Sequence, residues 1–186
     1  MRLFVAMDLS ESVRARITQF CENLRRSYPA ARWVRSESVH VTLKFIGETA
    51  EARVDVIREA LRTVHSSAPV DLMFRKVGFF PNERRPRVFW VGIDASPNLA
   101  EIAREIESTL GRIGIPRETR EFKPHLTLAR FDDPRGIDKL HAAIREAGDA
   151  EFGSLRTSEL HLYKSDLQRG GAKYTSLETF AIAPMQ

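Results

Sequence analysis

The sequence predicts an α+β protein of two lobes, each a small mixed or antiparallel sheet with helices on its outer side. The order strand, helix, strand, helix, strand occurs twice along the chain. The motif His-x-Thr-Leu also occurs twice, at residues 40–43 and 125–128, and the offset of 85 residues between the copies also relates Arg2 to Arg87. Such a duplication predicts a pseudo-two-fold axis with one copy of the motif on each side.

The 186 residues suit a single domain that is large enough to bury a sizeable apolar core. We expect one domain over residues 1–186, with the first copy at about 1–84 and the second at about 85–186. No linker rich in serine or proline separates the copies, which favours a shared core.

Each copy opens with an apolar strand that ends in Asp-x-Ser, within residues 2–10 and 87–96, and an amphipathic helix follows. We expect Ser10 to cap the first of these helices, and Ser96, with Pro97 at the first helical position, to cap the second. The apolar residues at helical spacing are Val13, Ile17, Phe20 and Leu24 in the first helix and Leu99, Ile102, Ala103, Ile106 and Leu110 in the second.

The rest of each copy repeats the same order. Strands are predicted at the motifs, 40–45 and 125–130, and a further helix follows each motif, with apolar positions within 54–64 and 137–144. Each copy closes with a strand, around 70–80 and around 155–163, and a last strand at 173–183 completes one of the sheets. The order of strands within the sheets does not follow from this pattern.

Composition excludes several classes of function. The single cysteine, Cys21, has no partner for an internal disulfide or a cysteine metal site, so redox chemistry is not expected. No apolar run is long enough to span a membrane, and we expect a cytoplasmic monomer with no membrane association. A net charge of +4 favours a polyanionic partner such as nucleic acid.

The two motifs carry the chemistry. Side chains alternate along a strand, so His40 and Thr42 share one face, as do His125 and Thr127. The pseudo-two-fold axis then places two imidazoles and two hydroxyls in one cleft between the lobes. Near neutral pH a neutral histidine accepts a proton and a protonated one donates it, while hydroxyls stabilise charge on phosphate oxygens. This set predicts displacement at a phosphodiester without a metal or another cofactor, since no carboxylate cluster is placed to hold a cation.

These features resemble the two-histidine (2H) phosphoesterase superfamily, and in particular the RNA 2′,3′-cyclic phosphodiesterases, once called 2′-5′ RNA ligases. The resemblance covers almost the whole chain, and the matching segments are residues 2–6, 40–47, 80–87, 124–130 and 170–174. It implies hydrolysis of a 2′,3′-cyclic phosphate end of RNA or an oligonucleotide to a 2′-phosphomonoester.

The resemblance also implies a role for each motif residue. His40 is implied as the proton donor to the leaving 3′ oxygen and His125 as the proton acceptor that activates water, an assignment that residue chemistry alone leaves open. Thr42 and Thr127 are implied to contact the phosphate.

Three further residues are weaker candidates. Arg130 is a candidate phosphate contact, but strict alternation places it on the face opposite His125 unless the strand ends or bulges. Lys44 is expected on the face of His40, either in solvent or against a backbone phosphate. His161 alternates with two leucines, so it is a candidate to face the cleft.

Other functions remain open at this point. The same site could join RNA in the 2′-5′ direction or act on another cyclic phosphate, such as ADP-ribose 1″,2″-cyclic phosphate. A non-catalytic RNA-binding module is the alternative from a different class.

Overall fold

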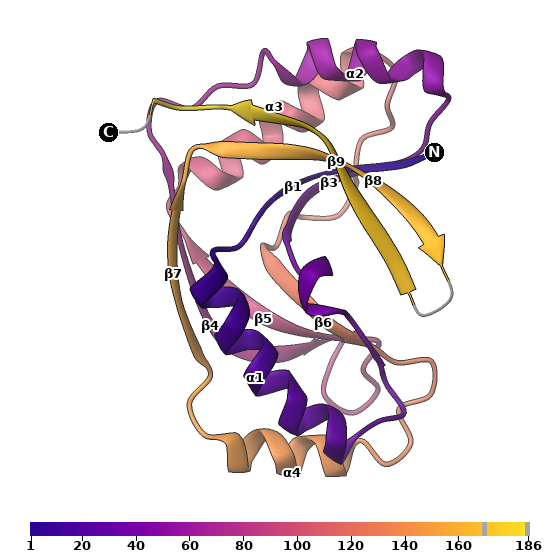
Figure 1. Ribbon diagram of the computed structural model, residues 1–186, viewed down its shortest axis with the longest axis vertical. Coiled ribbons are helices and arrows are strands. Elements are labelled where there is room, and N and C mark those ends of the chain that lie inside the picture. Colours follow the sequence, from indigo (N-terminus) through magenta and orange to yellow (C-terminus); the bar gives the residue numbers. More distant parts are fainter. Residues whose placement is uncertain (169–170, 185–186) are drawn as a thin grey trace.

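The computed structural model describes residues 1–168 and 171–184, so Gly170 of the terminal matching segment lies outside it. The described residues form two antiparallel sheets and four α-helices (Figure 1). Sheet A has the order β3 (Val41–Glu48), β1 (Arg2–Met7), β8 (Glu159–Gln168), β9 (Gly171–Ala181). Sheet B has the order β2 (Arg32–Trp33), β6 (His125–Arg130), β5 (Val88–Ala95), β4 (Val70–Phe80), β7 (Glu151–Thr157).

The helices cover one face of each sheet, called here the outer face. Helices α2 (Val54–Leu61) and α3 (Asn98–Arg112) lie over sheet A, and α1 (Glu11–Ser27) and α4 (Asp138–Ala147) lie over sheet B (Figure 1). Two short 3₁₀ turns, η1 (Ser36–Ser38) and η2 (Glu51–Arg53), complete the regular structure of the described residues. The prediction of an α+β protein with two sheets and helices outside is confirmed.

Four strands of each sheet have the same order when the two copies are matched, and β2 is an additional edge strand beside β6 in sheet B. The motif strand (β3 or β6) pairs with the opening strand (β1 or β5), which pairs with the closing strand of the other copy (β8 or β4). One more strand follows in each sheet, β9 or β7. The closing strands therefore cross between the lobes, and the buried side chains of both sheets form one continuous core.

Of the two serines predicted to cap helices, only one does so. Ser10 caps α1 as expected, because its Oγ accepts a hydrogen bond from the Val13 N–H at 3.4 Å. The expectation for Ser96 is wrong: its Oγ accepts from the Asp71 N–H at 2.9 Å and donates to Asn98 at 2.6 Å, and no side chain caps α3. The hydroxyl is occupied by a neighbouring strand before the helix begins.

The single closing strand expected around 155–163 is also wrong. Strand β7 ends at Thr157 in sheet B, and β8 begins at Glu159 in sheet A. Ser158 lies between them, is 2% exposed, and its carbonyl accepts a hydrogen bond from the Ile182 N–H at 2.8 Å. The chain therefore changes sheets at this residue, which periodicity along one strand cannot reveal.

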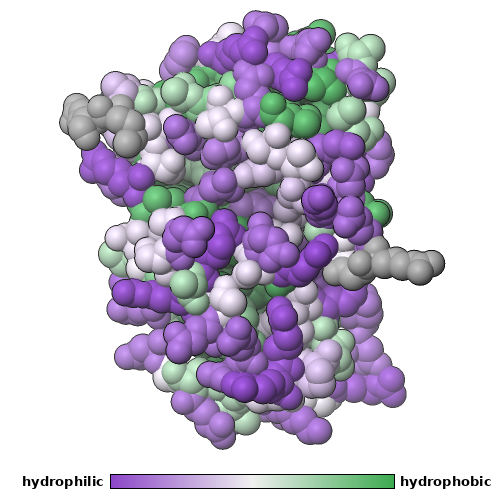
Figure 2. Space-filling model, viewed as in Figure 1, coloured by the Kyte–Doolittle hydropathy of each residue, from purple (hydrophilic) through white to green (hydrophobic). Residues whose placement is uncertain are grey.

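The surface carries little apolar area on the face seen in Figure 2, where hydrophobic residues form small scattered patches among hydrophilic ones. Among the described residues, no helix is long and apolar enough to cross a membrane.

Candidate active site

The two motif strands approach each other at the centre of the molecule (Figure 1). His40 directly precedes β3, and His125 is the first residue of β6. Both histidines, and Thr42 and Thr127, are half-buried, whereas the residues that alternate with them are buried against the outer helices. We call the face that carries these four side chains the site face of each sheet.

Each motif strand contains a β-bulge at the same place. Where β3 pairs with β1, Thr42 and Lys44 pair with consecutive residues, and Leu43 has no partner. Where β6 pairs with β5, Leu128 is skipped in the same way. The two skipped leucines are related by the offset that relates the histidines. A bulge adds one residue to a strand and so reverses the alternation of side chains beyond it.

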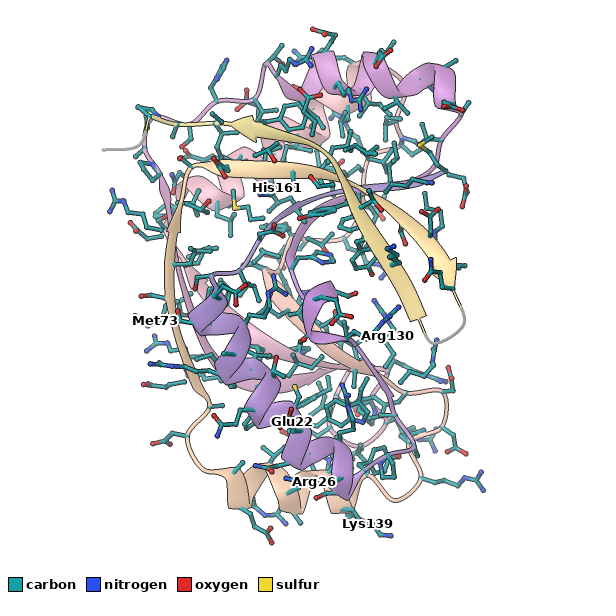
Figure 3. All side chains as sticks on the ribbon, viewed as in Figure 1. Glu22, Arg26, Met73, Arg130, Lys139 and His161 are labelled. Atoms are coloured by element: carbon teal, nitrogen blue, oxygen red, sulfur yellow. The ribbon has the colours of Figure 1, made fainter. Side chains whose placement is uncertain are left out.

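In β6 the bulge returns Arg130 to the site face. Leu128 and Ala129 are both buried, and Arg130 is exposed. Figure 3 labels Arg130 in the space between β6 and the hairpin of β8 and β9. Burial raises the pKa of Tyr174 on β9, and the positive charge of Arg130 opposes that rise. The charge of Arg130 on sheet B therefore acts on Tyr174 of sheet A.

In β3 the bulge moves Lys44 to the outer face, so its expected place beside the motif histidine is wrong. The Lys44 side chain is 3% exposed, and its Nζ donates hydrogen bonds to Glu107 Oε2 of α3 at 2.8 Å and to the Pro116 carbonyl at 2.7 Å. Phe45 takes the position on the site face, 64% exposed and with its ring centroid 6.2 Å from that of Phe4.

The buried pair predicts an unequal effect of removing its two members. Glu107→Ala should lower the free energy of unfolding by about 3 kcal/mol, because it leaves the Lys44 ammonium buried without its counter-ion. Lys44→Met should cost less, since the Glu107 side chain is 23% exposed and reaches water. Urea unfolding of both variants measures the difference. Equal losses, or a loss below about 1 kcal/mol for Glu107→Ala, would contradict this account.

His125 is held in one tautomer. Its Nδ1 lies 2.7 Å from the carbonyl oxygen of Lys123, which accepts hydrogen bonds only, so Nδ1 carries the hydrogen. Nε2 of the neutral ring is therefore free to accept a proton. The Phe80 ring meets the imidazole edge-on, with the centroids 5.2 Å apart, and restricts its orientation.

His40 lies among aromatic side chains of sheet A. Its ring is stacked on Phe4 with the centroids 4.7 Å apart, and Tyr174 meets it edge-on at 5.1 Å. The ring of Tyr163 is nearly parallel to it at 6.1 Å. Neither tyrosine is among the residues predicted for the site, although Tyr163 alternates with buried Leu162, a pattern that places it on the site face.

The surroundings of His40 determine its charge. Burial lowers its pKa to about 4, while the negative charge of Asp8 and a hydrogen bond with the Ser38 backbone act in the opposite direction. The positive charge of Arg14 lowers the pKa further. Ser38 and Lys123 stand at matching places, two residues before their histidines.

His161 also lies on sheet A (Figure 3). Its Nδ1 is 2.9 Å from Thr179 Oγ1, and its Nε2 is 3.8 Å from an oxygen of Asp8. It therefore contacts the neighbours of His40 rather than the motif of sheet B.

Residues that could hold a metal, and the hollows of the surface, were compared with the positions of the motif histidines in the described part of the chain. In residues 1–168 and 171–184, no group of three or more His, Cys, Asp or Glu side chains is arranged to hold a metal ion. A hollow of about 160 Å³ lies between α1 and residues 34–39, and none of the four motif side chains lines it. The motif residues lie half-buried on the site faces of the two sheets.

The protein thus belongs to a class of duplicated α+β proteins in which four strands of each sheet have equivalent order and each sheet carries a His-x-Thr motif at a bulged strand. Residues 8–169 match the family model described as the 2′-5′ RNA ligase superfamily. The chain belongs to this superfamily, and the resemblance found in the sequence is confirmed.

Relatives match over nearly the whole chain. A protein of Methanothermobacter thermautotrophicus, named RNA 2′,3′-cyclic phosphodiesterase, is 34% identical over 182 residues, which cover 97% of this chain and 98% of the relative. A protein of the same name from Methanocaldococcus jannaschii is 34% identical over 174 residues, with 94% and 96% covered.

Solved structures have the same fold. The protein TT0787 of Thermus thermophilus matches with a TM-score of 0.81 and 29% identity, with 98% of each chain covered. E. coli LigT complexed with 3′-AMP matches with a TM-score of 0.78 and 27% identity, with 97% of each chain covered.

Proposed function

We propose that this protein is a phosphodiesterase that hydrolyses 2′,3′-cyclic phosphate ends of RNA to 2′-phosphomonoesters, without a metal, using His40 and His125 as acid and base. The relatives' shared name supports the reaction. One observation carries the mechanism: the two histidines precede matching bulges on strands that meet. A monomer is sufficient, because one chain supplies both motifs.

In the proposed reaction, Nε2 of His125 takes a proton from water, and the water oxygen attacks the phosphorus. The bond from phosphorus to the 3′ oxygen breaks, and protonated His40 gives its proton to that oxygen. The product has a 2′-phosphate and a 3′-hydroxyl. His125 then holds the proton that it took from water, and exchange with solvent restores both histidines.

Thr42, Thr127 and Arg130 stabilise the charge that develops. The two hydroxyls donate hydrogen bonds to the non-bridging oxygens of the phosphate. The guanidinium of Arg130, on the same face of β6 as His125, adds a positive charge and further donors. All three side chains are proposed to contact the cyclic phosphate that is hydrolysed.

The lowered pKa of His40 links protonation to binding. With a pKa of about 4, His40 is neutral in the free protein at neutral pH. A phosphodiester brings a negative charge next to the ring, which favours the protonated form. Substrate binding and uptake of the catalytic proton are therefore coupled.

A product assay tests this function. The purified protein is incubated with a short RNA ending in a 2′,3′-cyclic phosphate, with and without a chelator, and the 2′- and 3′-phosphate products are resolved. We expect turnover to the 2′-phosphate alone, at the same rate in chelator. A 3′-phosphate product, or loss of activity in chelator, would contradict the mechanism.

The same assay separates the alternatives. Preference for ADP-ribose 1″,2″-cyclic phosphate would change the substrate and keep the site. A joined product when an RNA with a 5′-hydroxyl end is added would identify ligation. Binding of the RNA without turnover would identify a binding module and refute the enzymatic proposal.

A further inference from the structure

We propose that Asp8 is a positioning residue for His40, and that its negative charge favours the protonated imidazole that donates the proton in the proposed reaction. This inference rests on the proposed function. Asp8 directly follows β1, the strand that pairs with the motif strand of His40.

Asp8 is fixed in place by an aromatic residue of the histidine's own surroundings. The hydroxyl of Tyr163 on β8 donates to Asp8 and lies 2.7 Å from each carboxylate oxygen. The Tyr163 ring is stacked on Phe4 with the centroids 5.3 Å apart, and Phe4 is stacked on His40. The carboxylate and the imidazole are thus held by the same stack of rings, so their separation is set by the fold.

The charges around His40 come from several elements. Asp8 favours the imidazolium, and Arg14 of α1 disfavours it. Tyr163 and Tyr174 both have raised pKa values, with burial as the main cause, so both are neutral at physiological pH. Among the side chains that shift the pKa of His40, Asp8 is therefore the one that favours the protonated ring.

A second histidine adjoins the carboxylate. Nε2 of His161 is 3.8 Å from Asp8 Oδ2, and its Nδ1 is hydrogen-bonded to Thr179. His161 is thus the second ionisable side chain next to Asp8. The experiment therefore includes His161→Gln, which removes the imidazole and retains a polar side chain beside Asp8.

The second copy of the fold has a different arrangement. Its opening strand also ends in Asp-x-Ser, and the equivalent carboxylate is Asp94. Asp94 is exposed and forms an ion pair with Arg75 on β4. Its charge is therefore neutralised at the surface by a cation, whereas that of Asp8 is held by a neutral hydroxyl. The carboxylate at the end of the opening strand therefore lies near the motif histidine in the first copy and in a surface ion pair in the second.

NMR titration of both motif histidines in the substrate-free protein tests the proposal directly. Asp8→Asn keeps the size of the side chain and an acceptor for the Tyr163 hydroxyl but removes the charge. We expect it to lower the pKa of His40 and to leave that of His125 unchanged. Asp94→Asn is the matched control and should move neither. Asp8→Glu, which restores the charge, should return the His40 titration toward that of wild type.

The pH dependence of kcat gives a second readout. Losing the negative charge disfavours the imidazolium, so the proton is lost at lower pH and the alkaline fall in kcat should move to lower pH. For each unit of that shift, kcat on the alkaline side falls by about tenfold. We expect KM to change less than kcat, because the charge acts through His40. Asp94→Asn and His161→Gln should keep the alkaline fall close to its wild-type position.

Each outcome decides the proposal. An unchanged His40 titration in Asp8→Asn, with the fold retained by circular dichroism, refutes it. A shift of His125 in place of His40 reverses the assignment and also refutes it. If the wild-type protein has no activity on cyclic phosphate, the proposed function fails and the assigned role in donating a proton fails with it. The titration then shows separately whether Asp8 controls the charge of His40.

Discussion

Replacing either motif histidine with alanine is expected to lower kcat on an RNA 2′,3′-cyclic phosphate by about 10³-fold or more. A positioned acid or base contributes about 10² to 10⁴ in rate. His40→Ala removes the proton for the 3′ oxygen, and His125→Ala removes the base that activates water. His65→Ala is the control: His65 is exposed after the end of α2, and its loss should leave kcat near that of wild type.

A sulfur-substituted substrate distinguishes the two roles. When sulfur replaces the 3′ oxygen of the cyclic phosphate, the leaving group departs as a thiolate, whose conjugate acid has a pKa of about 8.5 in model thiols. Such a group needs no proton donor. We expect this substrate to restore much of the activity of His40→Ala and little of that of His125→Ala. Rescue of His125→Ala alone would reverse the assignment, and near-wild-type activity of either variant on the normal substrate would refute the paired mechanism.

Replacing the motif threonines has the second-largest expected effect. Thr42→Val and Thr127→Val should each lower kcat by about 10²-fold, the loss typical of removing one hydrogen bond to a developing negative charge. Valine has nearly the shape of threonine and retains the β-branch that favours a strand, so the backbone and the adjacent bulge should persist. The change therefore removes the hydroxyl and little else.

Serine provides the matched control at both positions. Thr42→Ser and Thr127→Ser keep the donor and should stay within about tenfold of wild type, since their hydroxyls rotate more freely. Single-turnover rates with each variant separate the chemical step from binding. If the valine variants are as fast as the serine variants, the hydroxyls do not stabilise the phosphate. The two threonines would then serve only to favour the strand conformation.

Much of the fold followed from patterns local in the chain. Helical spacing of apolar residues located the four α-helices of the described residues, and Ser10 marked a true cap. The offset between the motifs predicted two equivalent sheets. The same local reasoning failed where a residue serves a distant partner. Ser96 binds a neighbouring strand instead of its helix, and Ser158 divides one expected strand into two that lie in different sheets.

The candidate site also has features that the sequence predicts and features that depend on strand pairing. The matching places of His40 and His125 on the two motif strands were predictable, because repetition of a motif is visible in sequence. The side of the strand on which Arg130 and Lys44 lie was not, because a bulge depends on how the partner strand aligns. One extra residue in each strand moved Arg130 to the histidine's face and carried Lys44 to Glu107.

The sequence by itself determined the class of fold, the duplication and the two motifs, since these depend on spacing along the chain. Tertiary structure alone decided which strands share a sheet, where alternation reverses, and what surrounds each histidine. Asp8 and Tyr163 are 155 residues apart, and only the pairing of β1 with β8 brings them together. Such contacts arise from long-range strand pairing and packing, which set the charge environment of an imidazole and leave no periodic trace in the sequence.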